Sequence, residues 1–317
     1  MSITVSVICL AYNHEKYIRK TLEGFVMQKT NFSVEYIIHD DASTDATASI
    51  IREFEEKYPT LIKPIYQKEN QYSKGVPISR GLQMKVEGKY MAFCEGDDYW
   101  IDEYKLQKQV TFMEQHPDCT LTIHNGFRLN DRTGQFKPLN PYKAKGFLSM
   151  KEVLAESGGM TPTASMVIKS DVLKKMPMNV FWIPGVGDRP KRLYLATQGR
   201  VYYFDDIMCV YRTDNINSFG GTLMHDNKKS KKLLENMLLF FERFDKYTGF
   251  KYTDAIELAK SKEHYLYYVR EKMYSKAIKT YYYRETTTPK EKIKDFIKWR
   301  TPRIVLDGIN WCISKIK

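Results

Sequence analysis

The sequence predicts an α/β fold in which a mostly parallel central sheet is flanked by helices and followed by a C-terminal helical extension. Three observations lead to this prediction. Short apolar runs typical of buried strands alternate with amphipathic helical patterns over the first two thirds of the chain. Polar residues directly follow three of these apolar runs. From residue 226 onward the pattern is helical and rich in Lys, Tyr and Leu.

The first half of the chain contains the clearest alternation of strands and helices. The predicted strands are 4–10, 34–39, 61–66 and 91–94. The predicted helices are 14–28, 44–58, 76–86 and 104–115. Ser43 or Thr44 can cap the second helix, and Pro59 ends it. This order favours a parallel sheet, because each strand is followed by a helical crossover.

The middle of the chain has shorter predicted elements. Strands are expected at 119–123, 163–168, 201–203 and 207–211, with Asp205 and Asp206 as a turn between the last two. Helices are expected at 149–155, where Ser149 and Glu152 have capping-box spacing, at 171–175 and at 189–198. Residues 130–146 and 182–189 are expected to be loops.

Length and composition limit the class of protein. The 317 residues suit one large domain with an appendage, and we predict boundaries at 1–225, 226–288 and 289–317. The net charge of +12 suits anionic partners. The five cysteines have no metal-site spacing. The first residues lack a basic segment and no apolar run reaches transmembrane length, so we expect neither a signal peptide nor a membrane-spanning helix. We therefore expect reduced thiols and a cytoplasmic protein that is at most peripheral at the inner face of the cell membrane.

The C-terminal segment 290–317 is predicted to form a basic amphipathic helix. It carries eight basic and three acidic side chains, and after Pro302 one apolar stripe contains Val305, Ile309, Cys312 and Ile316. Such a helix packs either on the preceding α/β domain or on an anionic membrane surface, and the charge favours the membrane.

The stretch 91–100 contains a cluster of carboxylates, and the other motifs are expected to lie around it. A short apolar strand leads directly into Glu95, Asp97 and Asp98 on a turn that contains Gly96. Clustered carboxylates repel one another unless a cation or ligand hydroxyls share the site, and Mg²⁺ or Mn²⁺ prefers such oxygen ligands. The alternative interpretation is an acidic turn that precedes a helix N-terminus.

Two other strand ends carry polar residues that suit the same site. Tyr12 and Asn13 follow the first strand, and Asp40 and Asp41 follow the second. The carboxyl ends of parallel strands meet at one edge of a sheet, so these residues are expected beside the acidic turn. Because no Gly-rich phosphate-binding motif is present, the metal and side chains such as Arg80 are expected to hold the phosphates.

Four segments together resemble the inverting GT-A glycosyltransferases of the large family-2 type. They are VSVICLAYNHEKYIRKTLEGFVMQ, YIIHDDASTDAT, GKYMAFCEGDDYW with IDEYKLQKQ, and GDRPKRLYLATQGRVYYFDDIMCVYR. They cover roughly residues 3–213. The resemblance implies a GT-A fold and a nucleotide-sugar donor, with UDP as the expected nucleotide.

The resemblance also implies roles for individual residues. Tyr12 would stack on the base, Asp41 would accept from its N–H edge, and Asp97 would meet the ribose. Asp98 would bind Mn²⁺ or Mg²⁺ at the diphosphate. Glu95 replaces the Asp that is usual at the start of this motif, which leaves its own role open.

On the acceptor side, the resemblance implies that Asp188 is the general base. A carboxylate there would take the proton of the acceptor hydroxyl as its oxygen attacks the anomeric carbon, which inverts the configuration. The alternative is a helix N-terminal residue that precedes Pro190. Thr161 and Thr163 are expected to contact the acceptor. After Arg212 the chain departs from the usual family pattern, so contacts from 213–219 are not carried over.

We therefore predict a metal-dependent transferase that moves a sugar from a nucleotide-sugar to a glycan or lipid-linked acceptor in surface polysaccharide or glycolipid synthesis. The alternative is a catalytically decayed protein that binds a nucleotide-sugar or a membrane. Nucleic acid is not an expected partner, because the basic residues gather in the C-terminal part without a nucleic-acid-reading motif.

Overall fold

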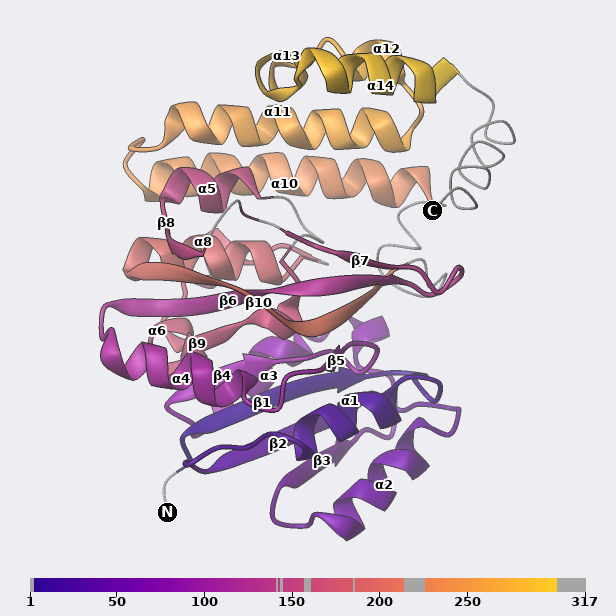
Figure 1. The fold of residues 1–317 in the computed structure, drawn as a ribbon, viewed down its shortest axis with the longest axis vertical. Coiled ribbons are helices and arrows are strands. Elements are labelled where there is room, and N and C mark those ends of the chain that lie inside the picture. The colour runs from indigo at the N-terminus through magenta and orange to yellow at the C-terminus, as the bar shows by residue number, and fades with distance from the viewer. Residues whose placement is uncertain are drawn as a thin grey trace.

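The structure is a computed structural model that describes residues 3–140, 142, 145–156, 161–184, 186–213 and 226–300. Within these ranges, ten strands form one mixed sheet with helices against it (Figure 1). The strands are β1 Val5–Ala11, β2 Val34–Asp40, β3 Ile62–Tyr66, β4 Tyr90–Phe93, β5 Tyr99–Trp100, β6 Cys119–Asn130, β7 Phe136–Pro138, β8 Gly146–Leu148, β9 Val167–Lys169 and β10 Arg200–Thr213.

The helices follow the amphipathic patterns of the sequence. In the first two thirds of the chain they are α1 Ile18–Val26, α2 Thr47–Lys57, α3 Ile78–Lys85, α4 Lys105–Gln115, α5 Met150–Ala155, α6 Ser170–Lys174, α7 Met178–Phe181 and α8 Asp188–Gln198. The extension contains α10 Asn227–Tyr247, α11 Thr253–Arg270, α12 Tyr274–Ala277, α13 Tyr281–Thr286 and α14 Pro289–Arg300. Two short 3₁₀ turns, at Tyr72–Lys74 and Thr163–Ser165, complete the set of helical elements in the described ranges.

The strand order places the polar strand ends together, as the sequence predicts. The order is β3-β2-β1-β4-β9-β6-β10-β5, and β3, β2, β1 and β4 are all parallel. Strand β9 is antiparallel to both of its neighbours, β4 and β6. The carboxyl ends of β1, β2 and β4 therefore meet at one edge of the sheet, where ligands of open α/β folds bind.

Several predicted elements in the middle of the chain are wrong in extent. The expected turn at Asp205 and Asp206 is instead an irregularity inside the continuous strand β10, where the pairing with β6 shifts register between Phe204 and Ile207. The expected loop 130–146 contains β7, which pairs with β6. The strand expected at 163–168 begins as a 3₁₀ turn. Polar residues at a bulge and in short edge strands explain these differences, since they resemble turns in the sequence.

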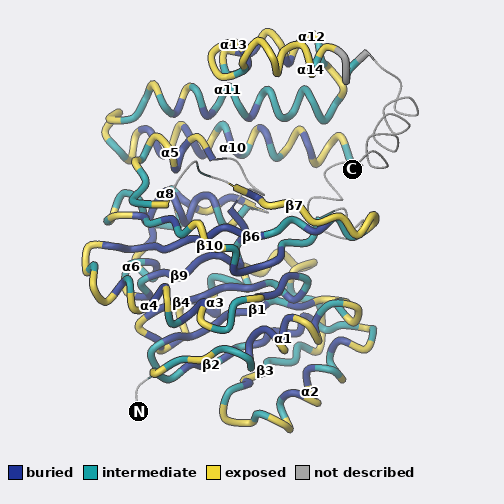
Figure 2. Tube along the Cα trace, in the orientation of Figure 1, coloured by how far each residue is buried: buried dark blue, intermediate teal, exposed yellow. Residues whose placement is uncertain are grey.

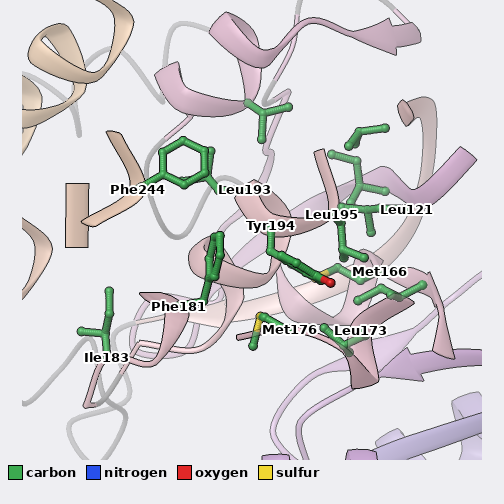
Figure 3. Close-up of a cluster of buried hydrophobic side chains, with 14 of the residues drawn as sticks. Leu121, Met166, Leu173, Met176, Phe181, Ile183, Leu193, Tyr194, Leu195 and Phe244 are labelled. Atoms are coloured by element: carbon green, nitrogen blue, oxygen red, sulfur yellow. The ribbon is translucent and has the colours of Figure 1, made fainter. Parts of the chain in front are cut away.

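The helical extension shares its hydrophobic core with the sheet. Phe181 and Tyr194 lie beside Phe244 of α10 in a buried cluster (Figure 3). The ring centroids of Phe181 and Phe244 are 5.9 Å apart. In Figure 1 the long helices α10 and α11 stack above the sheet, with α12 to α14 beyond them. The boundary predicted at 225/226 therefore separates two segments that pack around one continuous core, and the three-part division of the chain stays a prediction.

The outermost helices are the most exposed part of the extension (Figure 2). On α14, Ile293 and Phe296 are 63% and 56% exposed. The ring of Trp299 stacks on Tyr274 with centroids 4.8 Å apart, so α14 packs on the fold through one side. The apolar stripe that was predicted after Pro302 lies outside the described residues. Among the described residues, no helix combines the length and apolar character needed to cross a membrane.

The thiols of the described part agree with the expected reduced state. Cys9, Cys94, Cys119 and Cys209 are all buried and free. Cys312 lies outside the described residues.

Candidate active site

The loops after β1 and β2 are tied together at the edge of the sheet. Asn13 has a left-handed backbone with φ of 54°, and its side-chain oxygen accepts from the main-chain N–H of Thr44 at 2.8 Å. The N–H of Asn13 donates to Ser43 Oγ at 3.0 Å. Asn is among the residues that tolerate this backbone region best, which explains its position after the strand. Tyr12 and Asp41 are thereby held on adjacent loops.

Tyr12 and Asp41 differ in their surroundings. Tyr12 is 44% exposed, which leaves an aromatic face free to stack on a base. Asp41 is buried, and its two oxygens accept from the main-chain N–H groups of Gln71 and Tyr72 at 2.7 and 3.0 Å. The carboxylate therefore orders the loop at residues 71–72. Each carboxylate oxygen has a second lone pair, so this role leaves acceptor capacity for a base N–H.

The acidic turn after β4 is held by its own backbone and by helix α1. The N–H of Asp98 donates to the carbonyl of Glu95 at 3.0 Å. Thr21 Oγ1 donates to the carbonyls of Gly96 and Asp98, at 3.0 and 2.6 Å. A Cβ at position 96 would lie 2.7 Å from His14 Nδ1, so only glycine allows the turn to approach that ring. The turn is thus fixed before any ligand binds.

The three carboxylates of the turn are not equivalent. Asp98 is only 3% exposed, and its Oδ1 accepts from the main-chain N–H of Arg212 at 2.9 Å. Burial and the neighbouring Asp97 raise the pKa of Asp98 well above its ordinary value. Glu95 and Asp97 are half-buried. Oδ1 of Asp98 is thus engaged by the backbone of β10, whereas Glu95 and Asp97 are the more exposed carboxylates of the turn. The role of Asp98 as a metal ligand stays a prediction.

Glu95 connects the acidic turn to helix α8. Burial, reinforced by Asp97, raises the pKa of Glu95 to about 7, while Lys191 acts in the opposite direction. Asp188 also acts on this carboxyl. Lys191 is buried, and its ammonium lies 4.7 Å from the centre of the Phe93 ring. Burial lowers the pKa of Lys191, and Glu95 and Asp188 oppose that effect. The sheet edge and α8 therefore contribute to one electrostatic site.

Asp188 is the first residue of α8, which begins one residue before the helix start predicted from the sequence. Its side chain is 25% exposed, and its Oδ2 accepts from Arg192 Nη1 at 3.3 Å, one helical turn later. It does not cap the helix by the usual geometry, because the residue at the N-cap is Gly187. The carboxylate is thus held by a cation at the start of a helix while part of its surface remains open to a substrate.

The positions of Arg80 and Thr161 differ from those expected from the sequence, whereas the position of Thr163 is compatible with its expected role. Arg80 donates to the carbonyls of Leu173 and Lys174, at 3.2 and 2.8 Å, so its guanidinium anchors the end of α6. Lys191, rather than Arg80, is the cation whose charge acts on the Glu95 carboxyl, and Glu95 and Asp188 both act on Lys191 in turn. Thr161 is fully buried, which contradicts a direct contact with an acceptor. Thr163 is half-buried and starts a 3₁₀ turn.

Sequence reasoning assigned no role at this site to Lys191 or Tyr211. Tyr211 lies near the end of β10, where burial is the main factor that raises its pKa, followed by Asp98, Asp188 and Asp97. It therefore lies close to the acids of both the turn and helix α8. A tyrosine directly before Arg212 was visible in the sequence, but only the register of β10 shows which acids it meets.

Arg212 closes this side of the site. Its guanidinium lies 4.8 Å from the centre of the Tyr17 ring and 3.2 Å from Asp131 Oδ1. Tyr17 donates its hydroxyl to the other oxygen of Asp131 at 2.6 Å. The cation thus links helix α1, strand β10 and the segment after β6.

The carboxylates do not form a complete metal cage. Within the described ranges, no group of three or more His, Cys, Asp or Glu side chains is arranged to hold a metal ion. Glu95 and Asp97 nevertheless fit a hard cation chemically, because burial and then repulsion from Asp97 raise the pKa of Glu95, and a cation held by both carboxylates would offset both effects. Mg²⁺ and Mn²⁺ sites commonly combine one or two carboxylates with the phosphates of a substrate.

Comparisons with known proteins agree with the predicted family. The family model for glycosyl transferase family 2 matches residues 6–173. An uncharacterized protein of Mycobacterium tuberculosis is 36% identical over 210 residues, which cover 66% of this chain and 58% of the relative. The chain thus matches less than two thirds of that protein.

A second relative has an assigned activity. A UDP-Glc:α-D-GlcNAc-diphosphoundecaprenol β-1,3-glucosyltransferase of Escherichia coli is 39% identical over 111 residues, which cover 35% of this chain and 41% of that enzyme.

Among solved structures, the fold is similar to that of the mannosyltransferase PcManGT from Pyrobaculum calidifontis in complex with GDP-Man and Mn²⁺. The TM-score is 0.54 at 15% identity, with 87% of this chain and 76% of the other covered. At this identity the similarity concerns the fold, which is the GT-A arrangement that the sequence predicts.

Proposed function

Since this chain belongs to glycosyltransferase family 2, we propose that it is an inverting, metal-dependent enzyme that moves a sugar from a nucleotide-sugar to an acceptor hydroxyl. One observation carries the proposal. Asp188, at the start of α8, contributes to the raised pKa of Glu95 in the turn after β4, and both acids act on the pKa of the buried Lys191. This coupling supports a candidate base close to a candidate metal and diphosphate site.

The donor is proposed to bind along the loops after β1 and β2. Tyr12 offers an exposed ring for the base, and Asp41 offers an acceptor for its N–H edge. We propose UDP as the nucleotide, in keeping with the UDP-Glc in the name of the Escherichia coli relative. The GDP-Man complex of the similar fold shows why nucleotide identity has to be measured.

A divalent cation is proposed to sit between the diphosphate and the acidic turn. Asp97 and Glu95 would hold it, in place of the Asp98 that the family resemblance implies. When bound, the cation would neutralise negative charge that develops on the departing diphosphate. Manganese is one candidate, supported by the Mn²⁺ complex of PcManGT. Lys191, which is buried beside Glu95, supplies a second positive charge near the same leaving group.

Asp188 is proposed to act as the general base. Its carboxylate would take the proton from the acceptor hydroxyl while that oxygen bonds to the anomeric carbon and the bond to the diphosphate breaks. Attack from the face opposite the leaving group in a single step inverts the anomeric configuration. Thr163 is retained as an acceptor contact, whereas Thr161 is not, because it is fully buried.

The acceptor is proposed to be a lipid-linked glycan of surface polysaccharide synthesis. The name of the Escherichia coli relative, whose acceptor is a diphosphoundecaprenol-linked sugar, supports this class. The exposed Ile293 and Phe296 on the basic helix α14 support peripheral contact with an anionic membrane, which would place the enzyme at the cytoplasmic face. We expect the tail that follows to strengthen this contact.

A nucleotide panel tests the proposal. The thermal midpoint would be measured with UDP, GDP, dTDP and CMP, each with and without Mn²⁺, because a ligand that binds the native state raises apparent stability. A Mn²⁺-dependent rise with UDP supports the proposed donor class. A rise with another nucleotide would replace UDP. Absence of any rise, together with no transfer from a panel of nucleotide-sugars, would favour the decayed binding protein.

A further inference from the structure

Arg192 is a buried cation that forms an ion pair with Asp188. Its side chain is 1% exposed, and one nitrogen of its fork, Nη1, contacts both Asp188 Oδ2 at 3.3 Å and the carbonyl of Thr161 at 3.2 Å. The other nitrogen, Nη2, donates to Glu156 Oε2. Glu156 is also 1% exposed and directly follows helix α5. The guanidinium thus bridges a buried carboxylate and the candidate base.

The planar guanidinium group of Arg192 donates to both Glu156 and Asp188, so the position of Glu156 fixes the orientation in which Arg192 meets Asp188. Two nitrogens of one rigid group are engaged, so Arg192 cannot turn toward Asp188 in another way without breaking its contact with Glu156. The contact uses Oδ2 of Asp188. It leaves Oδ1 as the oxygen that can meet an acceptor hydroxyl.

The Glu156–Arg192 pair also affects the charge beside Asp188. Burial favours the neutral forms of Glu156 and Arg192, and their mutual attraction opposes it: burial raises the pKa of Glu156 while Arg192 acts to lower it. Asp188 faces charged or titratable groups from every element packed around it. These are Glu95 from the acidic turn, Lys191 and Arg192 from α8, Glu156 after α5 and Tyr211 from β10. Arg189, Lys262 and Glu263 surround the far side of the pair.

We propose that the buried Glu156–Arg192 pair positions the Asp188 carboxylate and balances the charge beside it, so that both are positioning residues of the transfer reaction. This inference rests on the proposed function of Asp188 as base. Arg192 places a positive charge beside the carboxylate of Asp188, and Glu156 offsets part of that charge.

The opposite charges of the pair predict opposite changes in pH dependence. Arg192→Met removes the cation beside the base, so the acid limb of kcat/KM moves to higher pH. Glu156→Gln leaves Arg192 without its partner charge, so the limb moves to lower pH. Each displacement is expected to be about 1 pH unit. A loss of packing alone would lower the rate at all pH values and would not separate the two variants.

Conservative variants test the positioning role of Glu156 and Arg192 while keeping the packing around them. Glu156 Oε1 has no hydrogen-bond partner among the described residues, so a Gln amide nitrogen in its place displaces no donor. Arg192→Lys retains the charge and is expected to restore most of the profile that Arg192→Met loses. Glu263→Gln is the matched control. It removes the negative charge of a second buried pair, between Arg189 of α8 and Glu263 of α11, in which Asp188 takes no part.

The experiment has two readouts. The first is transfer between pH 5 and 9, with kcat and KM for the donor measured separately. The second follows the Asp188 carboxyl by ¹³C NMR during a pH titration of the aspartate-labelled full chain, with Asp188→Asn for assignment. We expect Arg192→Met and Glu156→Gln to displace both curves in opposite directions, with KM for the donor nearly unchanged and Glu263→Gln without effect.

The possible failures are distinguishable. Absence of transfer by the wild-type chain from every donor contradicts the proposed function, while the NMR titration still decides the charge coupling. An active wild type with unchanged curves in both variants, or with equal displacement in Glu263→Gln, would overturn the positioning role and leave the proposed function standing.

Discussion

The main-chain N–H of Arg212 donates to Asp98 Oδ1 at 2.9 Å, so the end of strand β10 is fastened to the acidic turn after β4. The two segments are 114 residues apart in the sequence. In this contact Asp98 accepts a hydrogen bond from the backbone. Its neighbour Asp97 is half-buried and therefore more accessible to a ligand. The consecutive acids of the turn thus differ in exposure and in the backbone group that they contact.

This division predicts different outcomes for two similar substitutions. Asp97→Asn is expected to weaken Mn²⁺-dependent nucleotide binding by roughly 100-fold, because a metal ligand loses its charge. Asp98→Asn keeps an oxygen that can accept from Arg212 and should retain a clear Mn²⁺-dependent thermal shift. Isothermal titration with UDP and Mn²⁺ compares them. If Asp98→Asn lost the metal dependence and Asp97→Asn kept it, the family-derived assignment would stand.

Close packing at Gly96 gives a prediction about the geometry of the turn. A Cβ there would lie 2.7 Å from His14 Nδ1 and 3.1 Å from Ala11 Cβ, so Gly96→Ala must displace the ring or the turn. We expect a loss of about 1–3 kcal/mol in the free energy of unfolding, together with weaker nucleotide binding. Urea unfolding measures the first effect.

Gly81→Ala is the matched control for Gly96→Ala. Gly81 lies within α3, and a Cβ there meets no atom within 4 Å. That variant should gain about 0.5–1 kcal/mol through helix propensity. Equal behaviour of the two variants would show that the close approach of His14 is unimportant.

Lys105 predicts a pH dependence of stability. It is fully buried beneath the site, with its ammonium 4.1 Å from the centre of the Trp100 ring, and burial lowers the pKa of Lys105 to about 7. The unfolded chain keeps the ordinary value of about 10.4, so between these values the unfolded state binds more protons and stability rises with pH. Below about pH 7 both states are protonated and the penalty is constant.

Lys105→Met should therefore stabilise the protein most at pH 6–7, by about 1–3 kcal/mol after the loss of the contact with Trp100, and the gain should shrink toward pH 10. Urea unfolding of both proteins at pH 6, 7.5 and 9 measures the difference. A gain that is the same at all three values would mean that Lys105 is not neutralised on folding.

We predict that two segments contact an anionic membrane: residues 301–317 and the exposed face of α14. Because α14 packs on the fold through Trp299, removal of residues 301–317 should leave the thermal midpoint nearly unchanged and reduce sedimentation with anionic vesicles. Replacement of the exposed Ile293 and Phe296 by Ser should reduce it further. Neutral vesicles are the control. Undiminished sedimentation of both variants would assign this region to the fold alone.

The sequence predicted the parallel half of the sheet well, because β1, β2 and β4 are apolar runs that end directly in polar residues. It predicted the continuous β10 as two strands, since Asp205 and Asp206 resemble a turn where the pairing merely shifts register. Long-range pairing decides such cases, and no local pattern encodes it.

The site was predictable to a similar degree. Asp188, Tyr12 and the acidic turn follow recognisable motifs. The motif gave no means to tell a buried Asp98 from a half-buried Asp97, because exposure depends on the strand that returns 114 residues later. Burial of Thr161 and the carbonyl contacts of Arg80 are likewise properties of packing. Sequence reasoning gave Lys191 no role, yet this buried lysine feels the charges of both Glu95 and Asp188.

The most direct test of the central claim is transfer by Asp188→Asn compared with its nucleotide binding. The substitution removes the proposed base while the acidic turn and the loops after β1 and β2 are untouched. We predict that transfer from the donor identified by the nucleotide panel falls by at least about 100-fold, with unchanged Mn²⁺-dependent nucleotide affinity. Transfer at near wild-type rate would contradict the assignment of Asp188 and, with it, the proposed mechanism.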